Sequence, residues 1–203
     1  MSYPYQILSL EDYHHEYKRS VEDPEGFWGE IAEHFVWRKK WDKVLSWDFQ
    51  GPNIKWFEGG RLNITENCLD RHLEWRGHEP ALIWEPNNPE DSHRVLSYKQ
   101  LHFKVCQFAN VLKNNGVKKG DRVCIYMGMI PELAIAVLAC ARIGAVHSVV
   151  FGGFAPKELA TRIDDAKPKA VLTASCGIEP GRVIPYKPLL YQAIDLSTSK
   201  PSA

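Results

Sequence analysis

The sequence predicts an α/β fold, a layered and mostly parallel sheet with flanking helices that follows an aromatic-rich, irregular N-terminal extension. From residue 80 onward, short apolar segments alternate with helix-length segments, which is typical of parallel strands joined by right-handed crossovers. All seven tryptophans lie before residue 85, in a stretch with few regular patterns. We therefore expect an extension at residues 1–79 that packs on the core and an α/β subdomain at residues 80–203.

The extension is expected to contain two helices. The first spans about residues 24–35, with Asp23 as its N-cap and Pro24 at a first position where the missing N–H costs little. The second spans about residues 67–76, where apolar side chains recur at helical spacing. The turn-rich stretch at 49–61 carries bulky aromatic side chains. Such anchors more often lie across another surface than form a platform for a ligand.

The first α/β elements are a strand at 80–85 and a helix that begins after a polar loop at 86–92. Ser97 is a strong N-cap, and Gln100 three positions later completes a capping box. The helix is expected to end at Gly116. A strand at 80–85 belongs, on this interpretation, to the same parallel sheet as the strands that follow.

The next elements repeat the alternation. A strand is expected at 122–127, then an apolar helix at 131–141 that Gly144 closes in a left-handed conformation. The apolar run at 146–151 suits a strand that is covered on both faces. A helix at 156–166 and a strand at 170–174 follow. The last residues, 195–203, are small and polar and indicate a loop.

Gly152 and Gly153 form the first candidate ligand site, between the strand at 146–151 and the helix that Ala155 and Pro156 begin. Glycines permit a sharp turn and leave backbone amides uncovered. Amides near a helix N-terminus favour an anion, and ligands of parallel sheets bind at the carboxyl ends of strands. Taken alone, such a glycine pair is more often a plain tight turn.

The second candidate site is the stretch 177–182, which follows the strand at 170–174. Its glycines and proline describe another sharp turn, and Arg182 has the planar guanidinium that grips phosphate. The alternative is a surface arginine on a hairpin-like turn. Glu179 would oppose a nearby anion, which weakens the case for phosphate.

Composition excludes several functional classes. The 203 residues carry 25 basic and 25 acidic side chains, so there is no general basic field to hold nucleic acid or an anionic membrane. The longest apolar run, 133–141, is too short to span a bilayer, and the N-terminus lacks the features of a signal peptide. The five cysteines show neither a zinc spacing nor a C-x-x-C pair. Free thiols indicate a reducing compartment, and we expect a cytoplasmic protein.

Several catalytic motifs are missing. No Gly-x-Gly-x-x-Gly follows a strand, so a nicotinamide-dependent oxidoreductase is disfavoured, and neither a P-loop nor a Gly-x-Ser-x-Gly elbow occurs. The histidines show no metal-ligand spacing, and His147 is expected to be a core side chain. Asp164 and Asp165 are expected on a solvated helix face rather than as an acid pair.

Five runs of residues carry a resemblance to a known family. They are residues 63–73, 120–127, 130–134, 138–154 and 162–166. In these runs the chain resembles the N-terminal part of the AMP-forming acetyl-CoA synthetases and their propionyl-CoA relatives, within the adenylate-forming superfamily. The resemblance covers nearly all of the chain from about Tyr17. It implies that the α/β subdomain is an incomplete part of an AMP-binding domain.

The resemblance also implies a reaction. A short carboxylate attacks ATP to give an acyl-adenylate and pyrophosphate, and the thiol of coenzyme A then displaces AMP. ATP and coenzyme A are therefore the expected small-molecule substrates. Mg²⁺ is expected for the full-length enzyme, with no ligands in this chain. In the family, the Phe-Gly-Gly segment and the later turn contribute to the coenzyme A nucleotide site.

Carried over residue by residue, the resemblance gives a cofactor-binding set but no catalytic residue. Phe151 would pack near the adenine, the two glycines after it would permit close backbone approach, and Arg182 would face a phosphate. The predicted set is Phe151, Gly152, Gly153, Glu179, Pro180, Gly181 and Arg182.

The chain departs from the family pattern in places. Glu179 stands where a second arginine is usual, and Gly128 where proline is common. Residues 177–182 and 187–190 look more like the propionyl enzymes, whereas residues 63–73 look more like the acetyl enzymes. The choice between acetate and propionate therefore stays open.

Length is the larger departure. In the family the ATP loop, the acyl pocket and the mobile C-terminal domain lie beyond the segment that matches residue 203. We therefore expect this chain to be inactive in adenylate formation by itself, with the remainder of the enzyme as a possible partner. The alternative is a non-catalytic module that binds coenzyme A or docks on a longer subunit.

Overall fold

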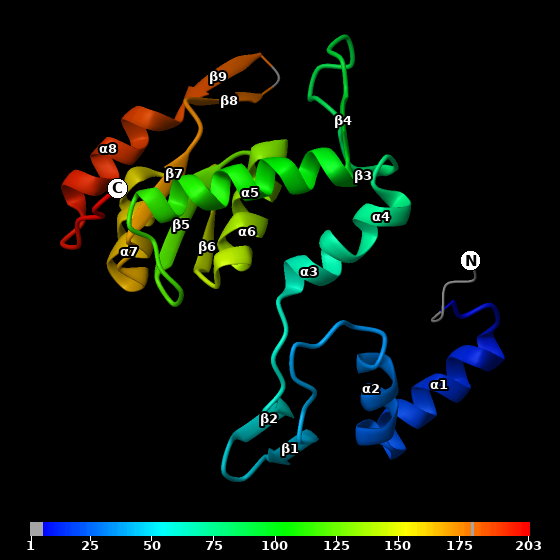
Figure 1. Ribbon diagram of the computed structural model, residues 1–203. Coiled ribbons are helices and arrows are strands. Elements are labelled where there is room, and N and C mark those ends of the chain that lie inside the picture. The colour runs from blue at the N-terminus through cyan, green and yellow to red at the C-terminus, as the bar shows by residue number, and fades with distance from the viewer. Residues whose placement is uncertain (1–5, 180) are drawn as a thin grey trace. The chain divides into compact units, whose positions relative to one another are not determined.

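The computed structural model describes residues 6–179 and 181–203 (Figure 1). Its internal contacts divide the chain into two compact units, Met1–Asn63 and Ile64–Ala203. Each unit is described by itself below. The division lies earlier than residue 79, where the sequence analysis ends the extension, and that domain boundary stays a prediction.

The first unit contains two helices and a hairpin. Helices α1 (Leu10–Glu22) and α2 (Pro24–Ala32) precede the antiparallel strands β1 (Lys43–Asp48) and β2 (Asn53–Glu58). The extension is thus more regular than expected, because β1 and β2 form an antiparallel hairpin across part of the stretch expected to be irregular.

The start of α2 is as predicted and its end is not. The Asp23 carboxylate accepts a hydrogen bond from the Gly26 N–H at 3.0 Å, which confirms the N-cap. The helix stops at Ala32 rather than at 35. The indole N–H of Trp37 donates to the Ala32 carbonyl at 2.8 Å and so satisfies a helix-end acceptor as the chain turns away.

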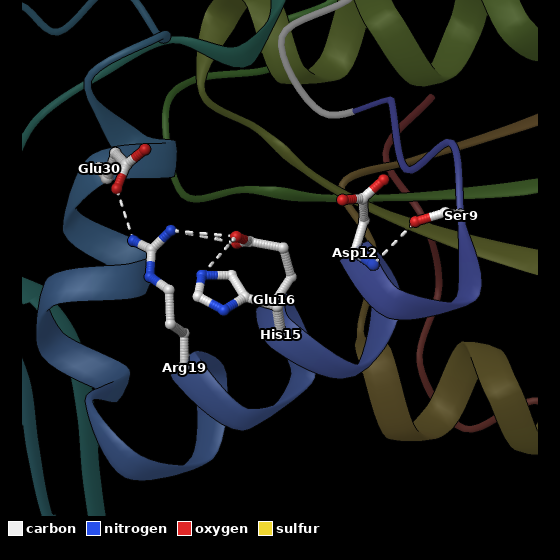
Figure 2. A network of polar contacts seen from close by, with 6 residues as sticks. All are labelled: Ser9, Asp12, His15, Glu16, Arg19 and Glu30. Atoms are coloured by element: carbon white, nitrogen blue, oxygen red, sulfur yellow. Dashed lines mark hydrogen bonds and ion pairs between the residues drawn. The ribbon is translucent and has the colours of Figure 1, made fainter.

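Aromatic rings and surface ion pairs hold the first unit. The rings of Trp37, Trp41 and Phe57 pack on one another, with centroids 5.0 to 5.5 Å apart. On the helices, Arg19 of α1 pairs with Glu16 at 3.1 Å and with Glu30 of α2 at 2.6 Å (Figure 2). Trp37 and Trp41 therefore pack inside this unit, whereas Trp28, Trp47 and Trp56 are exposed.

The second unit begins with short helical pieces instead of the single helix expected at 67–76. These pieces are α3 (Ile64–Cys68), the 3₁₀ turn η1 (Asp70–His72) and α4 (Leu73–Arg76). The Asp70 carboxylate binds both terminal nitrogens of the Arg142 guanidinium, at 2.7 and 2.8 Å. We attribute the break in the helix to this long-range contact, which sequence periodicity does not contain.

A second hairpin follows. Strand β3 (Pro80–Trp84) pairs antiparallel with β4 (Arg94–Ser97). The prediction that the 80–85 strand belongs to the parallel sheet is therefore wrong, because the polar loop after β3 returns the chain alongside it.

The parallel sheet has the order β6-β5-β7 in the described part of the chain. It consists of β5 (Arg122–Met127), β6 (Val146–Phe151) and β7 (Ala170–Thr173), all parallel. Four helices accompany it: α5 (Tyr98–Asn114), α6 (Pro131–Ile143), α7 (Pro156–Ala166) and α8 (Tyr186–Leu196). The predicted α/β architecture with a parallel sheet is confirmed.

Strand β5 separates two hydrophobic cores. Its side chains alternate between the sheet faces, as the pleat requires. Val123, Ile125 and Met127 join the core formed with α5 and α6. Cys124 and Tyr126 join the core formed with α7 and α8. The central strand is therefore buried on both faces.

Strand β6 does not have the predicted burial. It is the edge of the described sheet, and Val146, Val149 and Phe151 are 52%, 50% and 71% exposed. His147, expected in the core, is exposed as well. An apolar run fits an edge strand and a central strand equally well, so composition does not separate the two.

Local capping predictions were accurate. The Ser97 side chain accepts from Gln100 and the Gln100 side chain accepts from the Ser97 N–H, which confirms the capping box. Gly144 ends α6 at φ +73°. The regular structure after β7 was not predicted. This part of the chain forms a third hairpin, β8 (Cys176–Glu179) and β9 (Arg182–Pro185), which α8 follows.

Candidate functional site

A cleft of about 710 Å³ lies beside the carboxyl ends of β5 and β6, where ligands of parallel sheets bind. Four segments wall it in: the loop after β3, the loop from β5 to α6, the loop after β6, and strand β8. Tyr186 at the start of α8 completes the lining. The size suits part of a cofactor.

Two hydrogen bonds between segments that are distant in the sequence connect the walls of the cleft. The Trp84 indole N–H donates to the Met129 carbonyl at 2.7 Å, which ties the β3 hairpin to the loop after β5. The Asn87 amide donates to the Ile178 carbonyl at 2.6 Å and connects the loop after β3 to β8. The opposite walls are thus held by contacts between segments far apart in sequence.

Phe151, Gly152 and Gly153 all line this cleft. The Phe151 ring is 71% exposed and meets Phe154 edge-to-face, with centroids 5.7 Å apart. A Cβ on Gly153 would lie 2.5 Å from the Phe151 ring. Gly153 therefore gives the aromatic ring room to fold over the loop.

The glycines of this loop are needed for space rather than for backbone conformation. Neither Gly152 nor Gly153 has a positive φ. A Cβ on Gly152 would lie 2.7 Å from the Tyr186 hydroxyl oxygen and 3.3 Å from the Met127 carbonyl oxygen. The expected sharp turn is present, because the Phe154 N–H donates to the Phe151 carbonyl at 3.1 Å, and the glycines serve it by allowing close packing.

The second predicted segment divides between the cleft and the surface. Glu179 lines the cleft, whereas Gly181 and Arg182 do not belong to its lining. Pro180 lies outside the described residues. Gly181 has φ +77°, a conformation that favours glycine in the hairpin turn.

Arg182 already has an anionic partner. Its Nε and Nη2 lie 2.8 and 2.6 Å from the same Glu179 carboxylate oxygen, Oε2. The arginine side chain is 69% exposed and the glutamate 43%. A phosphate would have to compete with this exposed pair.

Tyr186 is the cleft residue that sequence reasoning missed. Its side chain is 5% exposed, and its hydroxyl oxygen would lie 2.5 Å from a Cβ on Gly177 and 3.5 Å from one on Gly128. Burial, followed by the charge of Glu179, raises the pKa of this phenol, so it is neutral and keeps its proton at pH 7. Gly128 directly after β5 and Gly152 directly after β6 were the available sign in the sequence that a large side chain lies against them.

The charged side chains that line the cleft are acidic. Its lining includes Glu85, Asp91 and Glu179, and no lysine or arginine among the described lining residues. Most other lining side chains are apolar. Such a surface suits an uncharged group better than a phosphate.

Metal and thiol chemistry find little support. In the ranges 6–179 and 181–203, no group of three or more His, Cys, Asp or Glu side chains is arranged to hold a metal ion. Burial raises the pKa values of the Cys124 and Cys140 thiols to about 11. Both act as small buried hydrophobes. No helix among the described residues has the length and apolar character needed to cross a membrane.

Asp164 has a structural role that the sequence analysis missed. Rather than facing solvent freely, one carboxylate oxygen accepts from the Ser197 hydroxyl at 2.6 Å and from the Thr198 and Ser199 backbone amides at 2.8 and 2.9 Å. These hydrogen bonds lower the pKa of Asp164 to about 2, and they fasten the end of α8 to α7.

Two family models of known proteins match the chain. The model "Acetyl-coenzyme A synthetase N-terminus" matches residues 13–68, and "AMP-binding enzyme" matches residues 69–199. Over 181 residues, 89% of the chain, it is 54% identical to an acetyl-coenzyme A synthetase of Alkalilimnicola ehrlichii and 56% identical to one of Leptospira biflexa. It is 52% identical over 196 residues, 94% of the chain, to acetyl-coenzyme A synthetase 2 of Pseudomonas aeruginosa. The matches span 28%, 28% and 30% of these relatives.

Proposed function

The chain belongs to the family of AMP-binding enzymes and carries the N-terminal segment of acetyl-coenzyme A synthetases. From this premise we propose that it contributes part of the coenzyme A site of an acetate–CoA ligase. The whole enzyme would join a short carboxylate to coenzyme A with conversion of ATP to AMP and pyrophosphate. The cleft beside β5 and β6 would receive part of coenzyme A.

Phe151 carries the proposal. It is a large aromatic ring at the edge of the cleft, more than two thirds exposed, and a glycine beside it keeps its surroundings open. Exposed aromatic rings at pocket edges offer a flat surface on which a purine base stacks. The remaining apolar lining supplies contact area for the rest of the molecule.

Arg182 has a conditional role in this proposal. Its guanidinium must release Glu179 to bind a phosphate outside the cleft. Because the pair is exposed and screened by solvent, that exchange is inexpensive. Phosphate binding at Arg182 would therefore add modestly to affinity and weaken with salt.

Calorimetric titration of coenzyme A into the purified chain tests the proposal. Wild-type protein is expected to bind, and Phe151→Ala is expected to bind roughly tenfold more weakly, since stacking on a base contributes about 1–3 kcal/mol. Phe103→Ala is the matched control, because Phe103 is 61% exposed on α5 and does not line the cleft. Absence of binding, or equal losses in the two variants, would contradict the proposal.

Adenylate formation is a separate question. The matches span less than a third of the relatives' length, and we propose that a polypeptide of residues 1–203 by itself releases no pyrophosphate from ATP and acetate. Sustained release would refute this. The acid itself is proposed from the names of the relatives as acetate. Propionate, favoured by residues 177–182, is separated from it by turnover of the whole enzyme with each acid.

A further inference from the structure

Tyr186 is held rigidly at the wall of the cleft. Its backbone N–H donates to the Ser175 carbonyl at 3.1 Å, and its ring packs against Tyr126 with centroids 5.2 Å apart. Both tyrosines belong to the core formed with α7 and α8. The position of the phenol oxygen is thus fixed by packing before any ligand arrives.

The two neighbouring phenols differ in their hydrogen bonds. The Tyr126 hydroxyl donates to the Phe154 carbonyl at 2.8 Å. Within the described residues, the Tyr186 hydroxyl has no hydrogen-bond partner, although the residue is 95% buried and lines the cleft. The hydroxyl oxygen is not one of the fully enclosed atoms without a partner, and Tyr186 lines the cleft, so this donor is available to a molecule in the cleft.

The chemistry of that molecule follows from the lining. A Cβ on Gly177, Gly152 or Gly128 would lie 2.5, 2.7 or 3.5 Å from the hydroxyl oxygen, so the absence of these side chains makes room for the phenol at the cleft wall. The carboxylates of Glu85, Asp91 and Glu179 line the same space without a basic side chain among the described lining residues. A phosphate is opposed there, whereas an uncharged acceptor on an apolar chain or ring is accommodated.

We infer that the Tyr186 hydroxyl is a ligand-binding group that donates a hydrogen bond to an uncharged acceptor of coenzyme A. This acceptor is an amide carbonyl of the pantetheine arm or a ring nitrogen of the adenine. The inference rests on the proposed function, because it takes the cleft as the place where coenzyme A binds.

The test compares wild type with Tyr186→Phe and with the control Tyr191→Phe. Tyr191 lies on the same helix but is 59% exposed and away from the cleft lining. In titration with coenzyme A, the Tyr186 variant is expected to bind roughly three- to tenfold more weakly, as the loss of one hydrogen bond predicts, and the control to bind as wild type.

Ligand-observed NMR with pantetheine and with adenosine identifies the acceptor. Weaker binding of pantetheine alone assigns the amide arm, and weaker binding of adenosine alone assigns the purine. If Tyr186→Phe binds coenzyme A like wild type, the inference is overturned while the proposed function stands. If wild type itself binds no coenzyme A, both fail.

Thermal unfolding separates binding from folding. Phenylalanine keeps the ring that packs on Tyr126, so the melting temperature of the Tyr186 variant is expected to stay near that of wild type. A lowered melting temperature with unchanged affinity would mean that the hydroxyl is only structural, which also overturns the inference.

Discussion

The two units of the molecule bury their side chains to very different extents. In the described part of the first unit, only Ala32 and Leu45 are buried hydrophobic residues. The second unit has two continuous cores on the faces of one parallel sheet. The first unit instead has edge-to-face and tilted contacts among the rings of Trp37, Trp41 and Phe57, together with exposed ion pairs such as those of Arg19 (Figure 2). Apolar content alone therefore does not indicate where a chain has its core.

The largest effect is expected from Ile125→Ala, at the centre of the sheet. Ile125 is 0% exposed, so truncation leaves a cavity and lowers the free energy of unfolding by about 2–5 kcal/mol. Ile54→Ala in β2, where the side chain is 54% exposed, is the matched control and is expected to cost much less. Urea unfolding followed by circular dichroism measures both. Equal losses would remove the contrast between the units.

Gly152→Ala tests the close packing around the cleft. The new methyl group would meet the Tyr186 hydroxyl and is expected to lower the free energy of unfolding by about 1–3 kcal/mol. Gly128→Ala is the control, because its Cβ would make an ordinary contact at 3.5 Å. Adding Tyr186→Phe to Gly152→Ala removes the oxygen and is expected to restore part of the loss. Urea unfolding that shows no recovery in the double variant would contradict this account.

Asp164 gives the second unit a stability that depends on pH. Its folded pKa of about 2 lies below the ordinary value of 3.8, so its stabilisation is fully present above pH 4 and is lost as the pH falls towards 2. Asp164→Asn is expected to lower the urea midpoint at pH 6, with a difference from wild type that shrinks below pH 4. Asp165→Asn, on the exposed side of the same helix, is expected to change neither. A difference that stays constant down to pH 2 would argue against the carboxylate.

The smallest effect is expected from Arg19→Met in the first unit. Its side chain is 37% exposed, and ion pairs of this kind are largely screened. A slight fall in melting temperature at low salt is expected to vanish in about 1 M salt, where the Debye length is near 3 Å. Lys18→Met, which breaks a more exposed pair with Glu22, is the control. A loss that persists at high salt would show that packing of the arginine stem matters more than its charge.

Local chemistry explains most of what the sequence predicted. The capping box of Ser97 and Gln100, the Gly144 cap and the extents of the strands β5, β6 and β7 depend on neighbouring residues, which a sequence shows directly. The hairpin that contains β3, the break near Asp70 and the edge position of β6 depend on contacts between distant segments. Periodicity carries no information about those contacts.

The candidate site shows the same division. The location of Phe151, Gly152 and Gly153 at a cleft followed from strand and turn patterns. The pairing of Arg182 with Glu179 and the place of Tyr186 did not, because both require the fold of the β8–β9 hairpin and of α8. Sequence reasoning thus placed these three residues at the edge of the sheet where the cleft lies, and it missed both Tyr186 and the Arg182–Glu179 pair. That the cleft is a ligand site stays a prediction.

One consequence of the sheet order concerns protein handling. Since β6 has a neighbour on one side only in the described chain, its outer backbone donors and acceptors form a ready template for another strand, bordered by apolar side chains. Self-association of concentrated protein along this border is therefore expected, and a lysine introduced at Val149 is expected to reduce it without touching the central strand.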